Sequence, residues 1–132
     1  MAAMSTFQVP VTVSNPYERA RSFEERFWVD TGAYYTFIPE DRLQQIGVTP
    51  IRSRKLVLAD GRVEECQLGE AVLFIPQLNE ALTCQIAFAP VGSLYLLGAT
   101  ALENFAVQAD PTAQQLKPLA TIIIGGFLAT RP

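Results

Sequence analysis

Large hydrophobic residues alternate with polar residues or proline along the first part of the chain. They occupy every second position, at Phe7, Val9, Val11 and Val13. A period of two is typical of a strand with one buried face, so the pattern predicts a strand here. Pro10 has no amide hydrogen to donate, so we expect this strand at an edge or with position 10 turned outward. Asn15-Pro16 predicts a turn, and the polar segment up to Ser22 is expected to be exposed.

Further apolar segments of strand length follow. They span residues 23–29, 51–58, 62–74, 81–88, 94–97, 105–109 and 114–116. Asp60-Gly61 predicts a tight hairpin turn between the second and third of these segments. Asn79 indicates another turn, and Gly69 predicts a break or bulge in its strand. Residues 94–97 are all apolar, which predicts a fully buried strand.

Two short helices are expected between these strands. Pro39 suits the first turn of a helix and Gly47 suits its C-terminal stop, so the spacing predicts a helix over 39–46. Thr100, followed three residues later by Glu103, forms a capping-box pattern that predicts a second helix. Many short strands with two short helices indicate a mostly β domain, arranged as a barrel or a sandwich.

The chain has 132 residues and about half of them are hydrophobic, which fits one domain with a single core. No repeat or linker divides it, so we expect one domain over 1–132, with its core at about 6–118. The formal charge is −3 and no large Lys/Arg cluster occurs, so a nucleic-acid partner is not expected. The basic segment 52–55 is interpreted as a solvated strand edge.

An apolar tail occupies residues 119–132. Its apolar part is too short for a membrane-spanning helix, which needs about 20 residues. Gly125-Gly126 can turn a small hairpin within the tail. Alternatively, the tail is a single strand that pairs with a partner.

The chain has no histidine, which excludes Ser-His-Asp and Cys-His catalysis and removes the commonest metal ligand. Its two cysteines, Cys66 and Cys84, form no zinc-site pattern, so neither a metal nor another cofactor is expected. Both fall in predicted strands, where free buried thiols are expected rather than a disulfide. Residues 1–7 lack the basic and apolar regions of a secretory signal, which predicts a cytoplasmic location.

Residues 27–33, Phe-Trp-Val-Asp-Thr-Gly-Ala, carry the candidate chemistry. An apolar strand ends at Asp30, whose carboxylate costs free energy beside such residues unless it is paired or hydrogen-bonded. Thr31 has a hydroxyl that can donate and accept, and Gly32 allows close approach of a second backbone. Taken alone, the triplet also fits an ordinary turn after a strand.

Three blocks of the sequence resemble those of the single-domain aspartic proteases of the retropepsin type, in the same order and spacing. Residues 29–39 resemble the active-site loop of that family, and residues 96–102 resemble its hydrophobic-hydrophobic-glycine motif. Between them, residues 58–62 stand where such enzymes carry a flap. The resemblance covers about residues 6–118 and is closer to cellular members, including bacterial ones, than to viral ones.

The resemblance implies a retropepsin-like acid-protease fold, a closed β-barrel with short helices and one lobe per chain. It also implies roles for particular residues. The catalytic acid is Asp30; the active-site loop is supported by Thr31, Gly32 and Ala33; the flap is Ala59, Asp60 and Gly61; and the motif packed beneath the loop is Leu97 and Gly98. Thr31 is expected to form a hydrogen bond to a second subunit.

Aspartic proteases need two adjacent carboxylates that share a proton. This chain contains one Asp-Thr-Gly, so the second carboxylate must be Asp30 of another copy, related by a twofold axis. We therefore expect a homodimeric aspartic endopeptidase acting on a peptide or protein. Two alternatives remain open: a catalytically silent dimer that binds a peptide or protein in the same groove, and a structural β-domain whose tail docks into an assembly.

The sequence also departs from the viral pattern. Viral relatives often carry acids shortly after Asp-Thr-Gly-Ala and an arginine after the glycine of the second motif. Here those places hold Tyr34, Tyr35 and Ala99. The substrate preferences of the viral enzymes therefore do not transfer to this chain, and the single glycine of the flap predicts a stiffer tip.

Overall fold

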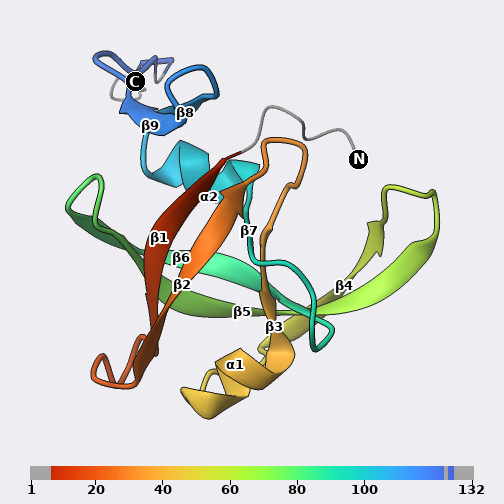
Figure 1. Ribbon diagram of the computed structural model, residues 1–132. Helices are drawn as coiled ribbons and strands as arrows, with labels where there is room; N and C mark the ends of the chain where they lie inside the picture. The colour runs from red at the N-terminus through yellow and green to blue at the C-terminus, as the bar shows by residue number, and fades with distance from the viewer. Residues whose placement is uncertain (1–6, 124, 127–132) are drawn as a thin grey trace, which may run out of the picture.

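Nine strands and two short helices make up the part of the chain that the structure describes (Figure 1). The structure is a computed structural model that describes residues 7–123, 125 and 126. The strands are β1 (Gln8–Ser14), β2 (Ser22–Val29), β3 (Thr36–Pro39), β4 (Arg52–Val57), β5 (Val63–Ile75), β6 (Glu80–Ala89), β7 (Leu96–Leu97), β8 (Val107–Asp110) and β9 (Gln115–Pro118). The helices are α1 (Glu40–Gln45) and α2 (Ala99–Asn104).

Six of these strands close into a barrel. Their order is β1-β2-β7-β3-β6-β5, and β5 pairs again with β1. The β2–β7 and β3–β6 pairs are parallel, whereas the other pairs around the ring are antiparallel. The prediction of a mostly β fold with a closed barrel is confirmed.

β1 has the predicted alternation and the predicted edge character. It pairs with β2 along its whole length but with β5 only from Thr12 to Ser14. Pro10 therefore lies in the half of β1 that has one neighbouring strand, where a missing donor is tolerated. The alternate valines of β1 are buried inside the barrel and pack with side chains from the other strands. Among these are Phe27, Ile38, Leu73, Ile75, Ile86 and Leu97.

The helices pack against this barrel through their buried residues. α1 buries Leu43, and Ile46 just after it is also buried. α2 buries Ala101 and Leu102. In Figure 1 the two helices lie at opposite ends of the barrel. Gly47 has a φ of +78°, as expected for the residue that ends a helix.

The β4–β5 hairpin extends away from the barrel (Figure 1). β4 pairs only with the first half of β5, from Arg52 opposite Leu68 to Val57 opposite Val63. The turn is closed by the amide of Leu58, which donates to the carbonyl of Arg62 at 2.7 Å. The Asp60-Gly61 turn prediction is confirmed as a hairpin.

The predicted break in β5 at Gly69 is wrong. β5 is one continuous strand, and its register with β6 is uninterrupted from Leu68 to Ile75. A side chain at Gly69 would place its Cβ 3.0 Å from Cε1 of Phe88 and 3.1 Å from the carbonyl oxygen of Thr49. Glycine therefore serves close packing here, where β5 passes from the hairpin into the barrel, and not a bulge.

Two further predictions about local structure are wrong. The strand expected over 94–97 reduces to Leu96–Leu97, and Leu94 is 60% exposed because it belongs to the loop before β7. Thr100 does not cap α2: the cap residue is Gly98, which has no side chain to form a capping hydrogen bond. The hydroxyl of Thr100 instead donates to the carbonyl of Tyr34 at 2.9 Å.

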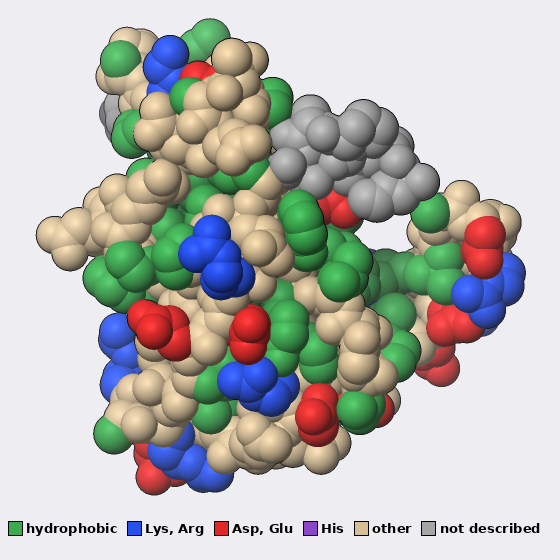
Figure 2. Space-filling view, in the orientation of Figure 1, with side chains coloured by type: hydrophobic (Ala, Val, Ile, Leu, Met, Phe, Trp, Pro, Cys, Tyr) green, Lys and Arg blue, Asp and Glu red, His purple; other side chains and the backbone are tan. Residues whose placement is uncertain are grey.

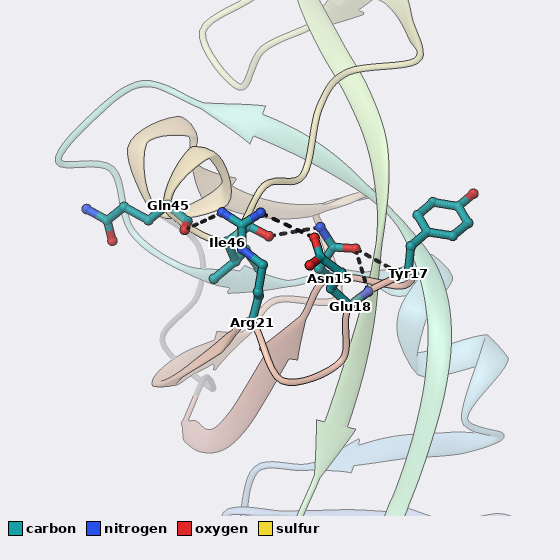
Figure 3. Close-up of polar contacts among 6 residues, drawn as sticks. All are labelled: Asn15, Tyr17, Glu18, Arg21, Gln45 and Ile46. Atoms are coloured by element: carbon teal, nitrogen blue, oxygen red, sulfur yellow. Dashed lines mark hydrogen bonds and ion pairs between the residues drawn. The ribbon is translucent and has the colours of Figure 1, made fainter.

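The β1–β2 loop is exposed for most of its length but is anchored by Asn15, which is buried (Figure 3). The Asn15 side-chain amide donates to the carbonyl of Ile46 at 2.9 Å. Its oxygen accepts from the amides of Tyr17 and Glu18. Arg21 donates to the carbonyl of Gln45 at 3.2 Å, so the loop holds the C-terminal end of α1.

Both cysteines are free, as predicted. Cys84 is buried, whereas Cys66 on the hairpin is only half-buried. Burial raises the pKa of both thiols, and the nearby charge of Glu64 raises the pKa of Cys66 further. Across the described residues, no helix has the length and apolar character needed to cross a membrane.

Residues 119–123 form no strand and are exposed; Ile122 and Ile123 are 56% and 95% exposed. The rest of the tail, except for Gly125 and Gly126, lies outside the described residues. The two interpretations of the tail as a hairpin or as a pairing strand therefore stay predictions.

Candidate active site

Asp30 lies where β2 leaves the barrel wall. β2 ends at Val29, whose amide donates to the carbonyl of Phe7 at 2.8 Å. The amide of Asp30 donates to the carbonyl of Leu97 at 3.0 Å. The backbone of Asp30 is thus fixed by a neighbouring strand, while its side chain is half-buried and faces an open groove.

The Asp-Thr-Gly loop folds back on the Asp30 carboxylate. The amide of Gly32 donates to Oδ1 of Asp30 at 3.0 Å, and the amide of Ala33 donates to the backbone carbonyl oxygen of Asp30 at 3.2 Å. A Cβ at Gly32 would lie 3.3 Å from the same Oδ1, so a larger residue would crowd the carboxylate. Thr31 is exposed, and its predicted hydrogen bond to a second subunit stays a prediction.

The Leu97-Gly98 motif lies directly against this loop, at the place that the resemblance implies. The amide of Ala99 donates to the carbonyl of Ala33 at 2.7 Å, and the amide of Thr100 donates to the carbonyl of Tyr34 at 3.0 Å. Any Cβ at Gly98 would overlap the carbonyl oxygen of Tyr35 and lie 2.8 Å from that of Ala33. Only glycine allows the two segments to approach this closely.

Two threonines that the sequence did not mark as site residues complete the support. Thr36 is fully buried, and its hydroxyl oxygen accepts from the amide of Gly98 at 3.1 Å. The carbonyl of Tyr34 accepts two hydrogen bonds from Thr100, one from its hydroxyl and one from its backbone amide. Each bond joins residues more than 60 positions apart, so no local pattern could have revealed it.

An open groove of about 1500 Å³ runs between the Asp30 loop and the β4–β5 hairpin. Figure 2 shows hydrophobic side chains along the hollow between the hairpin and the rest of the molecule. Its lining is contributed by the active-site loop, the hairpin, and the loops around β6, β7 and β8. Among the lining residues are Asp30, Thr31, Gly32, Ala33, Tyr34, Tyr35, Leu56, Leu58, Ala59, Leu96 and Pro111.

The flap residues of the resemblance are not all equivalent. Ala59 lines the groove, whereas Asp60 and Gly61 lie in the hairpin turn and are not among its lining residues. Asp60 accepts hydrogen bonds from the backbone amide of Arg62 at 3.0 Å and from its guanidinium at 2.7 Å. These two bonds to Arg62 lower the pKa of the Asp60 carboxyl. Asp60 therefore acts within the turn, holding its shape.

Carboxylates are few in the groove. Among the residues that the structure describes, the groove lining has one acidic residue besides Asp30, which is Glu64, and it accepts from Arg62 at 3.1 Å on the hairpin. Within the described part of the chain, no three His, Cys, Asp or Glu residues cluster as a metal site would require. The groove of one chain therefore offers a single carboxylate on the active-site loop.

No protein-family model matches this chain, and no curated protein matches it. Among solved structures, it is similar to a foamy viral protease-reverse transcriptase that was determined in complex with an RNA/DNA hybrid. The TM-score is 0.57 at 17% sequence identity, over 90% of this chain and 13% of that chain. At this identity the likeness establishes the fold, which is a retropepsin-like β fold.

Proposed function

We propose that this protein is an aspartic endopeptidase that works as a homodimer. The observation that carries the proposal is the placement of Asp30. Its carboxylate faces a groove covered on one side by a hairpin, and its backbone amide is held by the carbonyl of Leu97. An open groove of about 1500 Å³ suits an extended peptide better than a small molecule.

The chemistry requires two carboxylates that hold one proton between them. The ionised carboxylate removes a proton from a water molecule as the water oxygen attacks the scissile carbonyl carbon. The protonated one donates a hydrogen bond to the carbonyl oxygen as negative charge develops there. A proton then passes to the departing amide nitrogen, the C–N bond breaks, and the dyad returns to its starting state.

The single carboxylate of each loop is the argument for a dimer. Glu64 is already paired with Arg62 on the hairpin and is not part of the Asp30 loop. A twofold axis beside Asp30 supplies an identical second carboxylate, as the commonest symmetry of homo-oligomers allows. The exposed Thr31 and Gly32 stand on the same loop and are free to meet their copies.

The test is cleavage of an unfolded protein substrate at several pH values by the wild-type protein and by Asp30→Asn. The amide is nearly isosteric but cannot act as the base, so we expect the variant to lose activity by a factor of at least about 100. Circular dichroism of both proteins controls for folding. Equal turnover by a folded Asp30→Asn protein would overturn the proposal, and no turnover by the wild type would favour the silent peptide-binding alternative.

A further inference from the structure

One face of the β4–β5 hairpin is turned toward the groove. Leu56 packs against the cluster of Tyr35, Leu68 and Ala87 on the barrel wall. Side chains alternate between the two faces of a strand, so Arg54, two positions from Leu56, lies on the same inner face. Arg54 is accordingly among the residues that line the groove.

The charged neighbours of Arg54 on this face are Arg52 and Glu64, and the Glu64 carboxylate is already bound by Arg62 at 3.1 Å. The partner of Arg54 across the ladder is Cys66, which also lines the groove. The raised pKa of the Cys66 thiol keeps it protonated at neutral pH. Two positions away along β4, on the same face, lie Leu56 toward the turn and Arg52 toward the barrel. Arg52 stands opposite the buried Leu68.

The other charged side chains of the hairpin that line the groove have opposite charges beside them. Arg62 is bound by Asp60 at 2.7 Å and by Glu64 at 3.1 Å. Lys55 also lines the groove, but it stands opposite Glu65 in the ladder, and Glu65 accepts from Ser53 at 3.1 Å. Over residues 7–123, 125 and 126, Arg54 forms no ion pair, so of the two arginines that line the groove, Arg54 and Arg62, Arg54 is the one without a carboxylate partner there.

We propose that Arg54 selects peptides with an acidic side chain, a role that rests on the proposed peptide-binding function of this groove. Arg54 is exposed and free to meet a ligand, and a guanidinium presents a planar fork of donors that matches a carboxylate. Strands rise about 3.3 Å per residue, so Arg54 lies about 13 Å along β4 from Leu58 at the turn. In an extended peptide bound along β4, the residue that contacts Arg54 therefore lies about four positions from the residue beneath the hairpin turn.

The test uses fluorescein-labelled decapeptides of Leu, Phe, Ala and Ser, with a single Glu placed at each position in turn. A matched set carries Gln in place of Glu. Fluorescence anisotropy gives the dissociation constants with the full-length Asp30→Asn protein, which keeps peptides uncut. At one or two adjacent positions we expect Glu to bind about tenfold more tightly than Gln, as a charge-assisted hydrogen bond allows.

Three further substitutions in the same background assign the effect. Arg54→Gln should abolish the preference for Glu, and Arg54→Lys should retain part of it because the charge remains without the fork. Arg52→Gln is the matched control: it removes the same charge from the same strand, at a position that does not line the groove, and should keep the preference. Added salt should weaken the preference in the parent protein.

The inference is overturned if Glu and Gln peptides bind equally at every position, if Arg54→Gln keeps the preference, or if no peptide binds. Cleavage of the same peptides by the protein with Asp30 intact is scored separately. Glu-dependent binding without cleavage would support Arg54 and contradict the endopeptidase. Cleavage that ignores the Glu residue would support the endopeptidase and contradict Arg54.

Discussion

Two buried polar side chains support two loops of this molecule, the β1–β2 loop and the loop that carries Asp30. Asn15 and Thr36 are buried, and each makes a hydrogen bond to backbone far away in the sequence. A buried polar group that loses its partner costs about 1–3 kcal/mol, which is a large part of the stability of a small domain. Both residues therefore give sharp tests of how the fold is held.

Replacing Asn15 by alanine should lower the free energy of unfolding by about 2 kcal/mol or more. The substitution removes a donor to Ile46 and an acceptor for two amides of the β1–β2 loop. Urea denaturation measures the change. Gln45→Ala is the control, because its contact with Arg21 uses the backbone carbonyl and survives the substitution. Equal losses in the two variants would show that the Asn15 bonds contribute little.

Thr36→Val should lower the free energy of unfolding by about 1–3 kcal/mol, because the buried amide of Gly98 loses its acceptor while the side-chain volume is kept. It should also lower cleavage activity, since Gly98 packs against the loop that carries Asp30. Denaturation and initial-rate measurements on one preparation test both effects. Thr83→Val, an exposed site on β6, is the matched control; a Thr36 variant as stable and active as this control would contradict the role.

The candidate site residues could be proposed from the sequence, but the contacts that hold them in place could not. Asp30, Gly32 and Gly98 occur in recognisable local motifs. Thr36 carries no local signal, because its partner is 62 positions away. Thr100 shows the opposite error, a local signal that misleads. The capping-box pattern predicted that its hydroxyl caps α2, but the hydroxyl donates to the carbonyl of Tyr34 instead.

Among the secondary-structure elements, the long strands and the β8 and β9 strands were predictable, whereas two short strands, β3 and β7, were not. β1, β2 and β6 bury alternate or continuous apolar residues over seven to ten positions. β3 was missed and β7 was predicted too long, because each of these short strands is defined by pairing with its neighbours in the barrel. The glycine at position 69 of β5 is explained by the close approach of Phe88 and Thr49, which no pattern around the glycine indicates.

The β4–β5 hairpin is the element that we expect to move. β4 has only one neighbouring strand and is exposed except for Leu56, so little packing resists its opening. Hydrogen exchange should show faster exchange at 55–63 than at 70–75, and protection of 55–63 when a peptide occupies the groove. The β5–β6 turn at 76–79, which does not line the groove, is the internal reference. Equal exchange at 55–63 with and without peptide would mean that the hairpin is not a flap.

At the scale of the whole molecule, the barrel closes through contacts distant in sequence. β1 meets β5 at residues separated by about 60 positions, so closure could be expected only from the resemblance and not from the strand pattern. The closed barrel leaves Ile122 and Ile123 exposed beyond β9. An exposed pair of large aliphatic residues is the structural reason to expect association there.

Activity should depend on a dimer, and we expect the segment after β9 to help form it. Specific activity should fall on dilution through the dissociation constant, because each chain supplies one Asp30.

Burying Ile122 and Ile123 would contribute roughly 1.5–3 kcal/mol each, so Ile122→Ser with Ile123→Ser should weaken the dimer at least about tenfold. Sedimentation equilibrium measures the constant, and Tyr17→Ser, which removes a side chain 88% exposed on the β1–β2 loop, is the control. An unchanged dissociation constant would place the interface elsewhere, whereas full activity of a strict monomer would contradict the shared pair of carboxylates itself.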